Sequence, residues 1–328
     1  MFIAPSSLQQ IPLSNSAYTN EDRNLLMPIY LPIAELSIDL FLLLGLGALV
    51  GILSGIFGVG GGFLLTPLLI FMGIPAPVAV ASQANLVVAS SMSGMVSQLK
   101  RGNVDMRMGL VLLAGGLVGS FIGVLLFRYL RSVGQIDFTV AALYVVFLSV
   151  IGGLMLVEGV NALRQRTKPA RKPRRTWLHK LPLSMVFPRS RIAISIIPPL
   201  VIGFFIGLLA AIMGVGGGFI MIPAMIYLLG MPTAVVIGTS MFQILILAAA
   251  TSVMQAVTNQ SVDIVLGFIL MLGGAIGAQI GLSIGSKLRG EQLRILLALL
   301  VLGVGVQMFL TMLEPPAHPY SFKFLVAP

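Results

Sequence analysis

A glycine run that occurs twice is the stretch of this chain best suited to bind a small ligand. The motif Gly-Val-Gly-Gly-Gly-Phe fills residues 58–63 and again residues 214–219. Each copy lies between a long apolar segment and a short one, and four glycines in six residues hold a regular helix poorly. The short helix that follows would expose its first N–H groups and the positive end of its dipole. Such a helix start, with no side chains in the way, favours an anion.

Neutral polar side chains near the two runs supply further candidate ligands, because hydroxyls and amides can hydrogen-bond an oxyanion. The competing interpretations are that the runs form a hinge or a tight helix crossing, and that the polar side chains bond neighbouring helices. Further polar residues follow along the same helices: Ser90, Ser91, Ser93 and Ser97 in one half, and Thr251, Ser252 and Gln255 in the other. The candidate substrate-binding residues are Gly58, Gly60, Gly61, Gly62, Ser82, Gln83, Asn85, Gly214, Gly216, Gly217, Gly218, Thr239, Ser240 and Gln243.

Ionisable side chains are scarce in the apolar segments, and this limits the chemistry. Asp39 and Glu158 fall near the ends of predicted spans and are weak candidates for proton coupling. Asp105 and Asp263 come at helix starts, where a carboxylate opposes the helix dipole, so we expect a structural role. The chain has no cysteine, and its two histidines lie outside the predicted spans. We therefore expect no catalytic group, no metal and no cofactor.

Composition places the chain in a membrane. Hydrophobic residues make up 57% of it and charged residues only 9%, whereas soluble domains carry about 25% charged residues. The net charge of +10 does not point to nucleic acid, because ten Lys and Arg and no acid gather in residues 164–191. A basic loop of this kind indicates the cytoplasmic side, where it would lie against anionic lipid head groups.

The glycine run belongs to a repeat that extends over most of the chain. Up to the prolines the two halves are offset by 156 residues, and after the next turn by 158, so that Asp105 matches Asp263. Glycines spaced by four in both halves indicate close packing of helix backbones in lipid. They are Gly115, Gly119 and Gly123, matched by Gly273, Gly277 and Gly281.

We therefore predict an all-α polytopic membrane protein with two homologous halves, each of four full transmembrane helices plus one short broken or re-entrant helix. The predicted segments are an N-terminal arm (1–33), a first membrane repeat (34–163), a basic cytoplasmic linker (164–191), a second membrane repeat (192–313) and a C-terminal tail (314–328). The halves are inverted if the short segment completes a crossing, and parallel if it only dips in. Inversion fits the positive-inside rule better and is common in secondary transporters.

The chain resembles the sulfite exporter TauE/SafE family over about residues 36–313. The resemblance rests on the Gly-Val-Gly-Gly-Gly-Phe motif with a proline four residues later, on a Gly-x-Pro turn, on Val-Asp before the next span, and on their duplication. It implies movement of sulfite, sulfoacetate or other small organic or sulfur oxyanions across the bacterial cytoplasmic membrane, often outward. The arm, the length of the linker and the tail lie outside the resemblance.

We therefore expect a secondary transporter, and more specifically an exporter, of a small anion such as sulfite or an organosulfonate. It would alternate access around the two glycine-rich helix starts in the inner membrane, with the linker in the cytoplasm. Its partners would be the anion and the lipid bilayer, not nucleic acid; the sequence does not specify an oligomeric state. The alternative is a membrane scaffold or assembly factor that recruits partners through the basic linker. An intramembrane enzyme is disfavoured because no acid–base pair lies within the spans.

Overall fold

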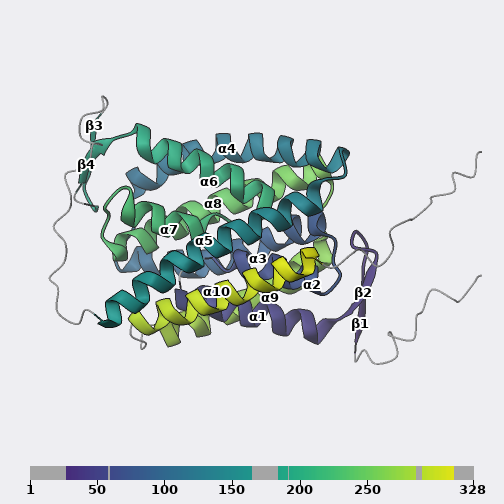
Figure 1. Cartoon of the computed structure of the whole chain (residues 1–328). Coiled ribbons are helices and arrows are strands. Elements are labelled where there is room, and N and C mark those ends of the chain that lie inside the picture. The colour runs from purple at the N-terminus through teal and green to yellow at the C-terminus, as the bar shows by residue number, and fades with distance from the viewer. Residues whose placement is uncertain (1–26, 58–59, 165–183, 191, 286–289, 314–328) are drawn as a thin grey trace, which may run out of the picture.

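The computed structural model describes residues 27–57, 60–164, 184–190, 192–285 and 290–313. Predictions about Gly58, most of the basic linker and most of the two terminal segments fall outside these residues. The described part forms ten helices and two β-hairpins (Figure 1). The helices are α1 (Leu40–Phe57), α2 (Gly62–Phe71), α3 (Ala76–Lys100), α4 (Met106–Ser132), α5 (Ile136–Arg164), α6 (Ile197–Met213), α7 (Gly218–Tyr227), α8 (Thr233–Asn259), α9 (Ile264–Gly285) and α10 (Gly290–Leu313).

A short antiparallel hairpin precedes the first helix of each half, which the all-helical prediction missed. β1 (Pro28–Leu31) pairs with β2 (Leu36–Asp39), and β3 (Ser184–Phe187) pairs with β4 (Ile192–Ser195). The first helix of each half therefore begins after its hairpin, at α1 and α6, and not at the predicted start of each membrane repeat (34 and 192). Apolar and polar residues alternate in β2, which favours a strand, but four residues are a weak signal beside a long apolar segment.

The helices are those of a multi-pass membrane protein. Six of them are long and apolar enough to cross a membrane: α1, α4, α5, α8, α9 and α10. Large apolar side chains such as Phe121, Phe205 and Phe268 are more than half exposed. Exposed apolar surface on this scale marks contact with another apolar phase, so these faces fit the hydrocarbon of a bilayer.

The two halves interlock instead of packing as separate bodies. α1 runs beside α9 and α4 runs beside α6, so each close pair takes one helix from each half. α3 packs on α8, and α5 packs on α10. The glycines spaced by four mediate the first two pairs, as predicted, because a Cβ on any of them would press on a carbonyl oxygen of the partner helix. These contacts are Gly115–Leu200, Gly119–Phe204, Gly123–Leu208, Gly273–Leu44, Gly277–Ala48 and Gly281–Ile52.

The two hairpins lie at opposite ends of the helix bundle (Figure 1). Because β2 leads directly into α1 and β4 leads into α6, the two halves start from opposite ends. Each half thus sends its first helix toward the middle of the bundle from its own side.

Replacing Gly119 by Ala is expected to destabilise the protein by about 1–3 kcal/mol, the usual cost of overpacking. The new Cβ would overlap the Phe204 carbonyl oxygen, so α4 and α6 would have to separate. Gly153→Ala is the matched control, because a Cβ at Gly153 meets nothing within 4 Å. Thermal unfolding in detergent measures both; equal melting temperatures for the two variants would contradict the close α4–α6 contact.

Candidate functional site

The two glycine runs meet in the interior of the bundle. The rings of Phe63 and Phe219, which end the two runs, stack with centroids 4.4 Å apart and planes 13° from parallel. A Cβ on Gly62 would lie 2.9 Å from the Val215 carbonyl oxygen. The starts of α2 and α7, one from each half, are therefore direct neighbours.

Both helix starts leave backbone N–H groups available. Gly61 and Gly217 are the N-caps of α2 and α7 with φ angles of 71° and 77°, and neither start has a side-chain cap. No backbone carbonyl of a described residue accepts a hydrogen bond from the amides of Gly218, Phe219 or Ile220. Free amides at a helix start attract negative charge.

An apolar pair lies between the two runs. A Cβ on Gly60 would be 3.5 Å from Val87 Cγ1 and 3.5 Å from Ile244 Cγ2, and one on Gly216 would touch the same two methyl groups. Val87 and Ile244 are both fully buried. They come from α3 and α8, so each central helix contributes an apolar side chain that contacts both glycine runs.

Buried polar atoms without a hydrogen-bond partner gather at the runs. The Ser91 hydroxyl is buried, has no hydrogen-bond partner among the described residues, and lies 3.6 Å from the Cβ position of Gly60. Gln83 Oε1 also lacks a partner, and its Nε2 is 3.5 Å from the carbonyl oxygen of Met213, just before the second run. Thr66 of α2 hydrogen-bonds the Tyr144 hydroxyl beside the second run. An unmet buried polar group costs about 1–3 kcal/mol, which a bound ligand with matching donors or acceptors would remove.

The remaining candidates on α3 and α8 occupy different surroundings. Asn85 Oδ1 accepts a hydrogen bond from the Ser252 hydroxyl (3.0 Å), and the Ser240 hydroxyl donates to the Ile237 carbonyl within its own helix. Gln243 is fully buried, neither of its amide atoms has a hydrogen-bond partner among the described residues, and it faces Gly116 of α4. It therefore lies where α4 and α8 pack, one helical face away from the glycine runs.

Ser82 and Thr239 bind the starts of two other helices. The Ser82 hydroxyl accepts from the backbone N–H of Asp263 at 2.8 Å, and the Thr239 hydroxyl accepts from that of Asp105 at 3.0 Å. Each hydroxyl thus joins a central helix of one half to a helix start of the other half.

Asp105 and Asp263 have the structural role that the sequence predicted. The Asp105 carboxylate accepts from the Met108 N–H at the start of α4, and Asp263 accepts from the Leu266 N–H at the start of α9. Of the proton-coupling candidates, Asp39 accepts from the Phe41 N–H (2.8 Å) at the start of α1. The side chain of Glu158 lies outside the described residues.

Tyr144 of α5 lies beside the second glycine run, and the sequence analysis did not single it out. Its hydroxyl donates to the Met213 carbonyl at 2.9 Å and lies against Thr66 and Gln83, and the side chain is fully buried. The available signal was a single tyrosine in the middle of an apolar span, whose hydroxyl needs a partner when buried. The described residues hold no group of three or more His, Cys, Asp or Glu side chains that could bind a metal ion.

Comparisons with known proteins agree with this architecture. The chain is 27% identical over 272 residues to a probable membrane transporter protein of Xylella fastidiosa, covering 82% of this chain and 94% of that protein. It is 22% identical over 275 residues to the probable membrane transporter protein YunE of Bacillus subtilis, covering 81% and 96%. No solved structure matches significantly. The model of the family Sulfite exporter TauE/SafE matches residues 43–308, so the chain belongs to that family of membrane proteins.

Proposed function

We propose that this protein is a secondary transporter of a small anion such as sulfite or an organosulfonate, and that the anion binds where the two glycine runs meet. The observation that carries the proposal is the meeting of two uncapped helix starts, one from each half. The side chains around them, Ser91, Gln83, Thr66 and Tyr144, are neutral. Helix-start amides and neutral donors can replace part of the water shell of an anion without fixing a strong counter-charge.

The halves would work as inverted repeats around this site. Two observations support this: the hairpins that begin the halves lie at opposite ends of the bundle, and the close pairs α1–α9 and α4–α6 exchange helices between halves. On this proposal α1–α2 and α6–α7 are re-entrant pairs that reach the middle from opposite sides, although α1 is long enough to cross alone. Each half then keeps three full crossings instead of the four predicted, and an odd number of crossings inverts the second half. Gly61 supports it, because its Cβ position lies against Val50 and Ser54 of α1, so the chain folds back on that helix. Rocking of one half against the other would alternate access.

The protein would lie in the inner membrane, and the end of the bundle that carries β3 and β4 would face the cytoplasm. Lys100 and Arg101 end α3 there, and Arg189 donates a hydrogen bond to the Gly102 carbonyl beside them. Positive charge favours the cytoplasmic side. The transport direction would be outward, as in an exporter.

The test is uptake and efflux by proteoliposomes containing the purified full chain. Radiolabelled sulfite, sulfate, methanesulfonate, acetate and chloride would be compared, with and without a proton gradient. We expect sulfite or methanesulfonate to move at least tenfold faster than in protein-free liposomes, and the other anions more slowly. Rates equal to those of protein-free liposomes for both sulfite and methanesulfonate would refute the proposed function.

A further inference from the structure

A hydrogen-bonded group of side chains from the first half holds the second half where α6 ends. The Tyr144 hydroxyl of α5 donates to the Met213 carbonyl at 2.9 Å, and Thr66 of α2 and Gln83 of α3 hydrogen-bond the same hydroxyl. Gln83 Nε2 also approaches the Met213 carbonyl, at 3.5 Å. Thr66, Gln83 and Tyr144 are all fully buried, and we call them the Tyr144 cluster. The cluster joins three helices of one half to one carbonyl of the other.

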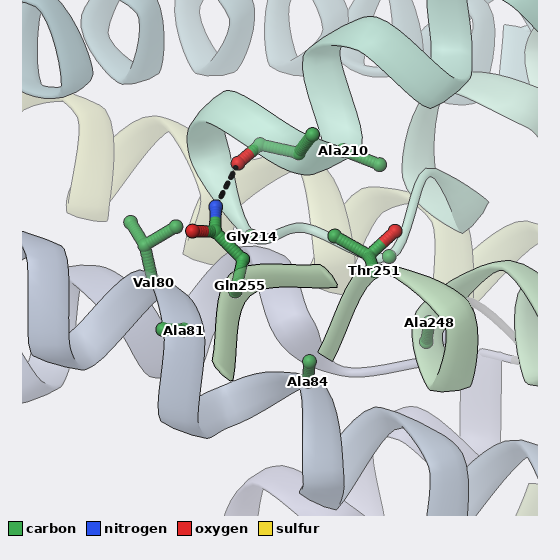
Figure 2. A pocket seen from close by; sticks show the side chains of 10 residues that line it. Val80, Ala81, Ala84, Ala210, Gly214, Ala248, Thr251 and Gln255 are labelled. Carbon is green, nitrogen blue, oxygen red and sulfur yellow. Dashed lines mark hydrogen bonds between the residues drawn. The ribbon is translucent and has the colours of Figure 1, made fainter. Parts of the chain in front are cut away.

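The carbonyl that the cluster binds comes directly before the second glycine run. α6 ends at Met213, and Gly214, with φ 73°, turns the chain into the run. The last carbonyls of a helix have no partner within it. The Gly214 N–H satisfies that of Ala210 at 2.8 Å (Figure 2), and the Tyr144 hydroxyl satisfies that of Met213. Since α2 begins at the first run, the Tyr144 hydroxyl connects the helix after the first run to the helix before the second.

The Tyr144 cluster lies toward the end of the bundle that carries β1 and β2. Arg131, at the end of α4, donates to the Asn259 carbonyl at the end of α8. Asp263, at the start of α9, accepts from the Ile33 N–H between β1 and β2. α4 therefore ends, and α5 starts, at the β1–β2 end. Tyr144 is eight residues from the start of α5 and twenty from its end, which is about 12 Å against about 30 Å along the helix axis.

Two of the three cluster residues have apolar counterparts in the second half. The runs and the prolines after them correspond at an offset of 156 residues, which places Ile222 of α7 where α2 has Thr66. Buried positions of α5 recur on α10 at an offset of 157, which places Val301 where α5 has Tyr144. These positions are Val140, Tyr144 and Ile151, matched by Leu297, Val301 and Met308. Neither Ile222 nor Val301 has a side chain that can form a hydrogen bond.

The counterpart of Gln83 bonds only within its own helix. The Ser82 hydroxyl accepts from an aspartate N–H at the β1–β2 end, and the Thr239 hydroxyl does so at the β3–β4 end. These equivalent contacts set an offset of 157 between α3 and α8, which places Ser240 where α3 has Gln83. The Ser240 hydroxyl donates to the Ile237 carbonyl. The polar cluster is therefore one-sided.

We propose that Tyr144 is a positioning residue of the transport cycle, and that its hydroxyl holds the second glycine run to the first half and keeps the β1–β2 side of the bundle closed. This inference rests on the proposed function. Opening of the β1–β2 side must separate Tyr144 from Met213, whereas the β3–β4 side has no equivalent cluster among its counterpart residues. The two halves are therefore unequal in what each opening breaks, although they repeat in sequence.

Thiol labelling tests the cluster, because the chain has no cysteine. Ala81 of α3 is buried and lies beside Gly214 (Figure 2), and Ser240 of α8 is buried near the β3–β4 end. A cysteine at either position should react slowly with 2-sulfonatoethyl methanethiosulfonate in the purified full chain. Adding Tyr144→Phe should speed the labelling of Ala81→Cys at least fivefold and that of Ser240→Cys less than twofold, because only one side loses its hydrogen bond.

Tyr129→Phe is the matched control, since it removes the hydroxyl of an exposed tyrosine on α4. It should change neither labelling rate. Size-exclusion chromatography checks folding; should Tyr144→Phe not fold, Thr66→Val, which removes a cluster hydroxyl and keeps the side-chain shape, takes its place with the same expectation. Unchanged labelling of Ala81→Cys, or the same acceleration at both cysteines, would overturn the proposal.

Uptake kinetics in proteoliposomes distinguish positioning from anion binding. The Tyr144 hydroxyl donates to a protein carbonyl, so Tyr144→Phe should change the KM for sulfite less than twofold. The maximal rate should fall at least fivefold, because a protein held in one open state completes the cycle more slowly. A tenfold rise in KM at an unchanged maximal rate would make Tyr144 an anion ligand and overturn its positioning role.

The two kinds of measurement separate this inference from the proposed function. Labelling that Tyr144→Phe leaves unchanged, in a protein whose wild type transports sulfite, would leave the transporter standing and remove the role of Tyr144. Wild-type protein that moves neither sulfite nor methanesulfonate would remove the proposed function and with it the transport role of Tyr144. The labelling itself needs no transport, so it shows in either case whether the hydroxyl holds this side closed.

Discussion

Gly217→Ala is expected to lower the initial rate of sulfite uptake at least tenfold while the protein still reaches the membrane. Gly217 has φ 77°, in the left-handed region, where a side chain costs about 1–2 kcal/mol. Its Cβ would also overlap Cγ2 of Ile206. Since Gly217 is the N-cap of α7, the helix start would shift and its free amides would no longer point at the anion. Gly61→Ala, with φ 71° at the start of α2, should behave alike.

Two other glycines separate the effect of position from that of backbone strain. Gly73 and Gly230 have φ 85° and 69°, and a Cβ on either meets nothing within 4 Å. Alanine at Gly73 or Gly230 has a similar free-energy cost for a left-handed backbone, but both positions lie away from the place where the two glycine runs meet. We therefore expect near wild-type uptake from these variants. All four variants would be reconstituted at equal protein density. A loss of the same size in all four would show that strain alone matters and that the runs have no special part in transport.

Local signals in the sequence predicted the parts of the site that depend on local structure. The duplicated run indicated two helix starts because glycine breaks a helix wherever it is concentrated, and α2 and α7 begin at Gly62 and Gly218. Spacing by four predicted the packing of Gly119 for a similar reason, since that spacing keeps residues on one helix face. These inferences need only the chain within a few residues of each position.

Contacts between the halves could not be predicted in the same way. The Ser82 hydroxyl meets Asp263, which is 181 residues away, and Thr239 meets Asp105, which is 134 residues away. Only the interlocking of the halves brings these pairs together. The choice of Ser82 and Thr239 as anion ligands remains a prediction, but in this structure both hydroxyls already accept a hydrogen bond.

Pairs of contacts around Asp105 and Asp263 tie the two halves to each other at opposite ends of the bundle. Asp105 is 1% exposed and also accepts from the Ser190 N–H (3.0 Å) and the Ser190 hydroxyl (2.6 Å), next to the β3–β4 hairpin. Asp263 is fully buried and accepts from the Ile33 N–H (2.9 Å) between β1 and β2. Each aspartate therefore caps one helix, receives a hairpin from the other half, and donates its own N–H to a central helix of that half.

Asp105→Ala is expected to destabilise the protein by about 2–4 kcal/mol, which combines a lost helix cap with donors left unmet at Ser190. Asp263→Ala should cost less, because fewer described donors depend on its carboxylate. Asp137→Ala is the control: this carboxylate also lies in a first helical turn, in α5, but it is exposed, so only about 0.3–1 kcal/mol of dipole interaction is lost. Thermal unfolding in detergent ranks the three.

The order of the three aspartate variants decides whether these contacts hold the halves together or only cap helices. If the aspartates only cap helices, Asp105→Ala and Asp263→Ala should lower the free energy of unfolding by similar amounts. Each amount should be close to the cost of losing an ordinary N-cap. If the contacts also hold the halves together, Asp105→Ala should lower the free energy of unfolding more than Asp263→Ala. Ser190→Ala, which removes one hydroxyl donor without touching the cap, should then also lower the melting temperature. A Ser190→Ala variant as stable as wild type would leave capping as the whole effect. If the halves rock as proposed, they must pivot where they stay connected, so measured contacts at both ends would also locate the fixed points of that movement.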